Sequence, residues 1–246
     1  VIRRIAADGT VSVFAGKVGT AGNTDGAAAD ARFNGPSGVA VDAAGVVYVA
    51  DSFNHTIRMI NPQGTVVTLA GVAGSAGSAD GASATAKFSY PSGIAVDAFG
   101  VYVADNGNHT IRRIFGGSVA TLAGTAGASG DVDATGAAAR FRFPNGLVAD
   151  GLGNVYVADS LNHAVRKVTA FGVVTTLAGS ISGLTGSTDA AGIAARFYQP
   201  YGVALDSAGN VYVADTLNST IRKVTPAGVV TTFAGTAGVT GSTDGM

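Results

Sequence analysis

The sequence predicts an all-β fold, a β-propeller built of four-stranded antiparallel blades, with about four and a half blades in 246 residues. The tetrapeptide Tyr-Val-Ala-Asp begins at positions 48, 102, 156 and 212, so one unit recurs every 54 to 56 residues. Phenylalanines at positions 33, 88, 141 and 197 recur in step with it. A period of this length is typical of arrays and propellers. Within each unit, short apolar runs alternate with Gly, Asp, Asn and Pro, which indicates strands joined by tight turns.

The unit that starts at residue 36 shows how each element is assigned. Its first apolar run, Gly-Val-Ala-Val-Asp, is small enough for the crowded centre of a ring. Three further runs are rich in β-branched or aromatic residues and are bounded by turn residues, as strands are. We name the four strands a, b, c and d; they cover residues 38–42, 46–51, 55–60 and 65–71.

A glycine-rich connector, residues 70–88 in this unit, leads to the next strand a. It ends in Asp-Gly-Ala-Ser-Ala-Thr-Ala-Lys-Phe, and an aspartate followed by alanine-rich sequence is typical of a capped helix start. We therefore expect one or two helical turns beginning at Asp80. The connector lacks the Gly-Lys-Ser/Thr ending of a phosphate-binding loop, so we interpret its glycines as a flexible linker.

The charged residues follow the repeat. All 16 acidic residues are aspartate, and 13 of them end strand a, end strand b or open the helical turn of the connector. Aspartate bonds to its own backbone in turns, so these positions indicate turn chemistry. Most basic residues lie in strand c or just before the connector phenylalanine. Charges that repeat with the fold predict ion pairs within or between blades.

The repeated unit Pro-x-Gly-[Val/Ile/Leu]-Ala-Val-Asp-x-x-Gly-x-Val-Tyr-Val-Ala-Asp-x-x-Asn-His-x-Ile-Arg-x-Ile resembles the NHL repeat. The resemblance covers residues 36–60, 91–114, 144–168 and 200–224. With the flanking strands it implies a single propeller domain over residues 1–246. Its parts are a half-blade with connector (1–35) and repeats 36–90, 91–143, 144–199 and 200–246. The long connector resembles the bacterial, often extracytoplasmic, variety, which implies an extracellular or cell-surface location.

The strand count poses a question of ring closure. Residues 1–35 supply only strands c and d, and four complete units follow, so 18 strands are expected. A ring that closes by sharing one blade between its termini needs strands a and b from the C-terminal side. We therefore expect the chain to be a segment of a longer propeller, with neighbouring blades among its partners.

Metal chemistry finds little support in the repeat. Each of the three histidines occupies the same turn position of a different blade, too far apart around the ring to share one ion. The resemblance implies channel-lining metal histidines in a related lyase, and a calcium site with a glutamate in lactonase-type propellers. Strand a has no histidine here and the chain has no glutamate. We predict no metal site and no cofactor; calcium at the Asp-x-x-Asn turn after strand b is the minor alternative.

Variation inside the uniform array indicates a binding face. The residues around the proline that opens strand a differ in every unit, and the three tyrosines outside strand b all lie there. In a propeller this connection opens onto one face beside the channel, and the variable b–c turn lies on the same face further out. Aromatic residues with an occasional arginine are typical of binding surfaces. The candidate binding residues are Tyr90, Arg142, Phe143, Tyr198 and Tyr201; packing between blades is the competing interpretation.

Composition narrows the function classes. The absence of cysteine excludes disulfide scaffolds and thiolate metal sites. A net charge of −1 speaks against a nucleic-acid partner. No apolar stretch approaches the roughly 18 residues of a membrane span, so we expect no membrane insertion. We predict a non-enzymatic binding or structural module that contacts protein or glycan. The alternative is a metal-dependent, lyase- or lactonase-like enzyme with its chemistry in the central channel.

Overall fold

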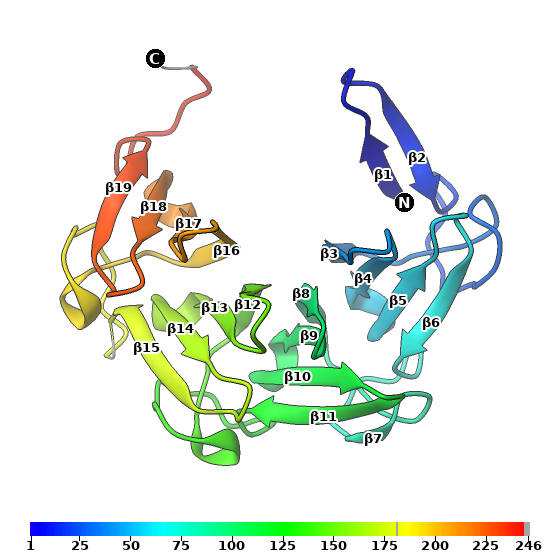
Figure 1. The fold of residues 1–246 in the computed structure, drawn as a ribbon, viewed down its shortest axis with the longest axis horizontal. Helices are drawn as coiled ribbons and strands as arrows, with labels where there is room; N and C mark the ends of the chain where they lie inside the picture. The colour runs from blue at the N-terminus through cyan, green and yellow to red at the C-terminus, as the bar shows by residue number, and fades with distance from the viewer. Residues whose placement is uncertain (181, 244–246) are drawn as a thin grey trace.

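A computed structural model describes residues 1–180 and 182–243. Among these residues it has four antiparallel sheets of the predicted kind and a two-stranded hairpin at the N-terminus. We call the sheets blades 1 to 4 in chain order. Figure 1 shows the blades side by side around one axis, with strand a of each blade nearest the centre. The all-β propeller predicted from the sequence is therefore confirmed.

The blades share one strand order, a-b-c-d from the centre outward, with antiparallel neighbours. The hairpin consists of β1 (Ile2–Ile5) and β2 (Val11–Ala15). Strands a are β3 (Pro36–Val41), β8 (Pro91–Asp97), β12 (Pro144–Ala149) and β16 (Pro200–Leu205). Strands b are β4 (Val47–Asp51), β9 (Gly100–Asp105), β13 (Val155–Asp159) and β17 (Val211–Asp215). Strands c are β5 (Thr56–Ile60), β10 (Thr110–Phe115), β14 (Ala164–Val168) and β18 (Thr220–Val224). Strands d are β6 (Val66–Ala70), β11 (Ser118–Ala123), β15 (Val174–Gly179) and β19 (Val230–Ala234).

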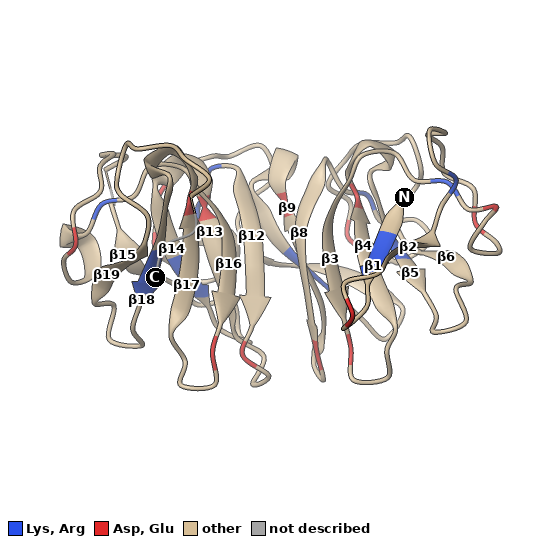
Figure 2. Ribbon diagram, turned by 90° about the horizontal axis from the view of Figure 1, so that it is seen from above, with Lys and Arg blue, Asp and Glu red and all other residues tan. Residues whose placement is uncertain are grey.

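Each b–c turn is a single turn of 3₁₀ helix. These turns are η1 (Ser52–Asn54), η2 (Asn106–Asn108), η4 (Ser160–Asn162) and η6 (Thr216–Asn218). In the side view of Figure 2, strand a runs from the top of the molecule to the bottom. We call the face with the b–c turns and the start of strand a the upper face. The lower face carries the a–b and c–d turns.

The connectors differ from the expectation of a capped helix. Two of them contain one turn of 3₁₀ helix, η3 (Gly136–Ala138) and η5 (Gly192–Ala194), and neither has a side-chain cap. In the connector before blade 2, residues 81–82 form the strand β7 (Gly81–Ala82), which pairs with β11 and is additional to the 18 strands expected. The prediction that Asp80 caps a helix was wrong, because its carboxylate instead accepts hydrogen bonds from Arg112 and Thr121.

The hydrophobic core lies between blades rather than within one. Between blades 1 and 2, for example, Ile57 of β5 packs with Val103 of β9 and with the connector phenylalanine Phe88. The same kind of cluster recurs between blades 2 and 3 and between blades 3 and 4. Because each blade covers its neighbour, the stability of one blade depends on the presence of the next.

The inner strands approach one another closely at a glycine. A Cβ atom added to Gly93 would overlap the carbonyl oxygen of Asn145 in the next strand a, and one added to Gly146 would overlap that of Tyr201. Only glycine permits this backbone contact. The glycine of the Pro-x-Gly motif therefore sets the spacing of the blades around the channel.

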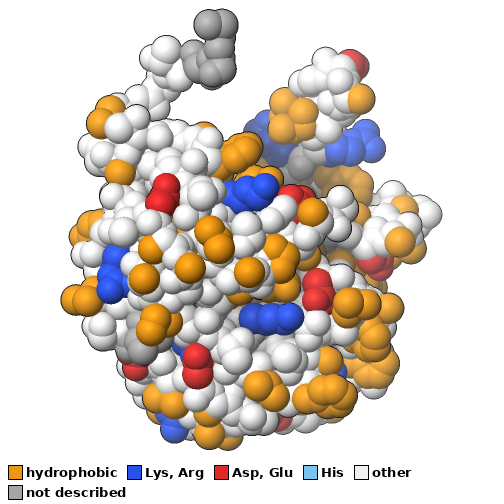
Figure 3. All heavy atoms as spheres, turned by 60° about the vertical axis from the view of Figure 1, so that its left-hand side comes forward, with side chains coloured by type: hydrophobic (Ala, Val, Ile, Leu, Met, Phe, Trp, Pro, Cys, Tyr) orange, Lys and Arg blue, Asp and Glu red, His pale blue; other side chains and the backbone are white. Residues whose placement is uncertain are grey.

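Among the described residues, no helix is both long and apolar enough to cross a bilayer. On the side of the molecule shown in Figure 3, apolar side chains lie in small groups separated by polar and backbone atoms.

Candidate binding face

The two variable segments predicted to share a face are hydrogen-bonded to each other in every blade. The amide of Leu161, in the b–c turn of blade 3, donates to the carbonyl of Arg142, two residues before strand a, at 3.1 Å. Equivalent bonds join Phe53 to Asn34, Gly107 to Ser89 and Leu217 to Tyr198. The prediction that these segments lie together is confirmed, and they form the upper face.

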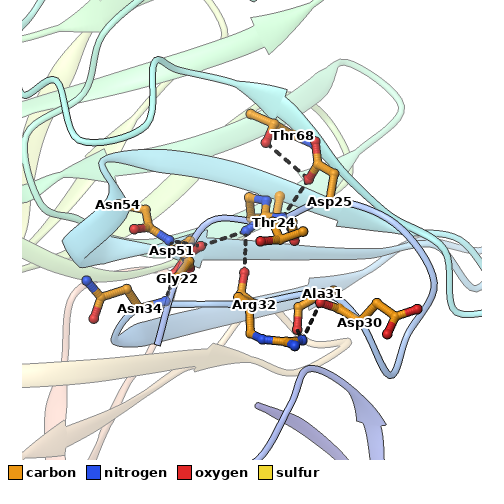
Figure 4. Close-up of polar contacts among 11 residues, drawn as sticks. Gly22, Thr24, Asp25, Asp30, Ala31, Arg32, Asn34, Asp51, Asn54 and Thr68 are labelled. Atoms are coloured by element: carbon orange, nitrogen blue, oxygen red, sulfur yellow. Dashed lines mark hydrogen bonds and ion pairs between the residues drawn. The ribbon is translucent and has the colours of Figure 1, made fainter. Parts of the chain in front are cut away.

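A buried aspartate at the end of strand b holds this face in place (Figure 4). Oδ1 of Asp51 accepts a hydrogen bond from the amide of Asn34 at 2.7 Å. Oδ2 accepts from the side-chain amide of Asn54 at 2.7 Å and from Arg58 at 2.9 Å. The other arm of Arg58 pairs with Asp25 of the connector. One carboxylate thus ties the start of strand a, the b–c turn and strand c together.

The network repeats in all four blades, as the predicted ion pairs require. Each strand-c arginine is at most 1% exposed, pairs with one strand-b and one connector aspartate, and lies 5.1 to 5.3 Å above a connector phenylalanine. Burial raises the pKa of Asp105 and of Asp159 to about 6, although their hydrogen-bond donors and the arginine charges act in the opposite direction. Because the arginine and asparagine occupy the carboxylate oxygens, the Asp-x-x-Asn turn is built around a guanidinium group. The absence of a resident cofactor stays a prediction.

The three histidines link successive blades. His55, His109 and His163 end their b–c turns in the left-handed conformation, as turn residues. Nδ1 of each accepts a hydrogen bond from the amide that precedes the proline of the next blade, at 3.1, 3.3 and 3.1 Å. Burial lowers the pKa of all three imidazoles. The sequence indicated the turn position of the histidines but not this link. Its only signal is the similar separation, 34 to 36 residues, between each histidine and the residue before the next proline.

All five candidate binding residues are exposed on the upper face. The exposed fractions are 50% for Tyr90, 40% for Phe143, 39% for Tyr198 and 46% for Tyr201, and Arg142 is also exposed. The rings of Tyr90, Phe143 and Tyr198 also stand edge-on to the histidine of the preceding blade, with centroids 4.6, 4.5 and 5.8 Å apart. These three residues therefore combine packing between blades with an open ring face.

The structure brings two of the five into one pocket. Phe143 and Tyr201 line a pocket of about 220 Å³ together with Leu161. Three polar residues that the sequence did not single out complete its wall: Asn106, Asn145 and Ser160. Asn145 and Tyr201 also line a depression of about 310 Å³ at the mouth of the channel. Tyr90 lies elsewhere on the face, and its ring centroid is 6.2 Å from that of Phe53. The missed residues also stand at variable positions of the repeat, which is the signal that identifies them.

The channel below this mouth is apolar. A cavity of about 370 Å³ there is lined by three consecutive residues of each of the four inner strands, all of them Val, Ala, Ile or Leu. Within the described residues, no group of three or more His, Asp, Glu or Cys side chains lies close enough to hold a metal ion. The described channel wall therefore presents backbone and aliphatic groups to a ligand.

Comparison with known proteins identifies the same repeats. Residues 19–79 match the Teneurin NHL domain, and residues 88–114, 141–168 and 197–224 match the NHL repeat. Together these matches cover more than half of the chain.

Relatives and one solved structure show the same likeness. The chain is 29% identical over 282 residues to the chloroplastic protein SUPPRESSOR OF QUENCHING 1 of Arabidopsis thaliana, covering 85% of this chain and 26% of that protein. It is 37% identical over 250 residues to NHL repeat-containing protein 2 of Bos taurus, covering 87% of this chain and 34% of that protein. The chain thus spans about a quarter to a third of the length of these relatives. Virginiamycin B lyase from Staphylococcus aureus shares the fold, with a TM-score of 0.58 at 14% identity over 94% of this chain and 61% of the lyase.

Proposed function

Because the chain belongs to the NHL-repeat family of β-propellers, we propose that it is a non-enzymatic binding module whose upper face contacts a protein or glycan ligand. The observation that carries this proposal is the pocket between Phe143 and Tyr201. Both aromatic rings are partly exposed, at 40% and 46%, whereas the connector phenylalanines that recur in every unit are buried. Exposed aromatic rings that line a pocket are typical of surfaces that bind a ligand or a partner protein.

The chemistry of the pocket suits a ligand with both apolar and hydroxyl or amide groups. The rings of Phe143 and Tyr201 offer flat apolar walls, on which a sugar ring or an aliphatic side chain can pack. The side chains of Asn106, Asn145 and Ser160 supply donors and acceptors around them. A small number of polar groups in an otherwise apolar pocket is typical of sites that orient a ligand.

The enzymatic alternative has less support in the described residues. General acid–base or metal-assisted chemistry in the channel needs titratable or metal-ligating side chains there. The inner strands present Val, Ala, Ile and Leu to that space. The likeness to the lyase, at 14% identity, extends to the fold alone. The proposal of an extracellular or cell-surface location depends only on the resemblance of the connector to that of extracytoplasmic relatives. One of the similar proteins is chloroplastic instead.

One end of the array supports the proposal that neighbouring blades are also partners. Ile57 and Ile111 of strand c are fully buried by the blade that follows each of them. The equivalent Ile221 of blade 4 is 39% exposed. The glycine equivalent to Gly146 in this blade, Gly202, likewise has room for a Cβ atom. A further blade of the same repeat fits this side of blade 4.

The upper-face proposal is tested with the double variant Phe143→Ala/Tyr201→Ala. We expect wild-type protein to bind selectively on arrays of glycans and of secreted proteins, and the variant to bind at least about tenfold more weakly. Phe171→Ala, which alters an 89% exposed ring on the lower face, is the matched control and should bind normally. Equal binding by the double variant would refute the site. A fall of several degrees in its melting temperature would support the packing interpretation instead.

A further inference from the structure

A cavity of about 780 Å³ opens on the lower face, between blades 1 and 2. It is separate from the upper-face pocket and larger. Its apolar wall includes Met59 and Leu69 of blade 1 and Phe115 of blade 2. Asp42, which follows β3, and Asp97, the last residue of β8, also line it. Figure 2 shows the acidic residues of these a–b turns along the lower edge of the molecule.

The cavity exists because both lower turns of blade 2 are short. Two residues separate β8 from β9 and two separate β10 from β11, whereas five separate the corresponding strands of blade 1. Aligned with the other repeats, the a–b turn and the c–d turn of blade 2 are each one residue shorter, and the strands beside them extend further. The effect is visible on the strand-b tyrosines: Tyr102 and Tyr156 are 0% and 8% exposed beneath the next blade. Tyr48, which faces blade 2, is less completely buried and lines the cavity.

The same junction lacks a cation that the other blades have. Strand c places a basic residue opposite the strand-b tyrosine in blades 2, 3 and 4, the pairs being Tyr102–Arg113, Tyr156–Lys167 and Tyr212–Lys223. In blades 3 and 4 the lysine Nζ lies over the tyrosine ring, 5.6 and 5.9 Å from its centroid. In blade 1 the residue opposite Tyr48 is Met59. The tyrosine ring of blade 1 is therefore left without its cation, at the place where the cavity opens.

The acidic residues at the cavity are Asp42 and Asp97, and Oδ2 of Asp97 accepts a hydrogen bond from the amide of Gly153 in blade 3. Oδ1 of Asp42 accepts hydrogen bonds from the amides of its own turn, and Oδ2 accepts one from Tyr48 at 3.0 Å. No lysine or arginine lines the cavity among the described residues, and the described ion pairs involve neither Asp42 nor Asp97. The buried Oγ of Ser83, also in the wall, has no hydrogen-bond partner in the described part of the chain.

We propose that this cavity binds a small amphipathic amine, whose ammonium group takes the place over Tyr48 that Lys167 and Lys223 take over their own tyrosines. The aromatic face and the carboxylate of Asp42 attract the cation, and Met59, Leu69 and Phe115 cover its apolar body. The volume lies within the range of small-molecule sites. This site is independent of the upper-face pocket, and its failure would leave the proposed function intact.

Calorimetric titration with 3-phenylpropylamine tests the proposal. We expect saturable binding of the amine. The isosteric 3-phenylpropionate should bind at least about tenfold more weakly, because it reverses the charge. Nα-acetyl-lysine methylamide carries the ammonium without the aromatic body and should also bind more weakly. Absence of saturable amine binding, or equal binding of the carboxylate, would overturn the proposal. Equal binding of the lysine compound would overturn the role of the apolar walls.

Two substitutions make the test specific to the junction. Met59→Lys restores the basic residue that blades 3 and 4 carry, so it should abolish amine binding while the protein stays folded. Lys167→Met removes the cation over Tyr156, but there the full-length turns of blade 4 cover the ring, so no second site should appear. Retained amine binding in Met59→Lys would assign the titration to another surface.

Discussion

Replacing Arg112 with methionine should destabilise the protein more than a change of one surface charge can. The guanidinium group is fully buried, and its two arms pair with Asp105 at 2.7 Å and with Asp80 at 2.6 Å. It also lies 5.1 Å above the ring of Phe88. Methionine preserves much of the apolar stem but leaves the buried carboxylate of Asp105 without a counter-charge.

The magnitude follows from what is left behind. Removing one partner of a buried ion pair costs about 3–5 kcal/mol, because the other charge stays desolvated. The carbonyl groups of Lys87 and Ala79, which also accept hydrogen bonds from Arg112, lose a donor in the variant. The Asp80 pair is half exposed and adds little. We therefore expect Arg112→Met to lose at least about 3 kcal/mol, a large share of the roughly 5–15 kcal/mol typical of a domain.

The loss should depend on pH in a defined direction. Burial already raises the pKa of Asp105 to about 6 in the wild type, and loss of the arginine raises it further. The folded variant then takes up a proton at a higher pH than the wild type or the unfolded chain does. The difference in stability between variant and wild type is therefore largest above neutral pH and shrinks as the pH falls toward 6.

Urea unfolding followed by far-ultraviolet circular dichroism measures both effects, since the chain has no tryptophan to report by fluorescence. Arg113→Met is the matched control, because the neighbouring side chain is partly exposed and has no salt bridge within the described residues. It should change the unfolding free energy by less than about 1 kcal/mol. An Arg112→Met loss equal to that of the control, or one that grows as the pH falls, would refute the reasoning.

Three further predictions concern the contacts between blades. His163 accepts a backbone hydrogen bond only when neutral and burial lowers its pKa, so its own contribution to stability should be lost as the pH drops below about 6.5. Melting curves from pH 5 to 8 should show that His163→Asn costs less stability at about pH 5 than at about pH 8. Gly146→Ala should cost about 1–3 kcal/mol because its Cβ overlaps the next strand, whereas Gly202→Ala, whose Cβ would make an ordinary contact with Ala214 at 3.7 Å, should cost under about 1 kcal/mol in urea unfolding. Ile111→Ala should cost about 2–5 kcal/mol, and Ile221→Ala less than half of that, because only the first isoleucine is fully buried.

Much of the fold could be predicted because the same pattern of strand and turn residues occurs four times. Strand and turn residues recur at one spacing, so the 16 blade strands and the shared face of the variable segments followed from the sequence. The connector prediction failed for a physical reason. Asp80 has the local sequence of a helix cap, but a buried guanidinium 32 residues away competes for its carboxylate and prevails. A distant partner of this kind leaves no local trace.

The candidate site could be predicted only in part. Exposure of Tyr90, Phe143, Tyr198 and Tyr201 was expected from their variability, yet which of them meet depends on how the blades are spaced around the axis. The lower cavity was missed because the reasoning compared residue types and not turn lengths. The shorter turns are visible in the sequence only as a shorter repeat: 53 residues separate Phe88 from Phe141, against 55 and 56 in the other intervals.

Two departures from the repeat coincide at the junction of blades 1 and 2, and neither alone would form a binding site. Short turns beside a lysine would leave that lysine solvated and the tyrosine ring already occupied, so no site would result. Methionine beneath full-length turns would bury the Tyr48–Asp42 pair without a cation, and a buried carboxylate without a counter-charge is costly. Together they leave the carboxylate accessible to solvent and the ring free. The coincidence is therefore better explained by a ligand that brings its own cation than by relaxed packing at one blade, and Met59→Lys separates the two explanations because it restores the residue while leaving the short turns unchanged.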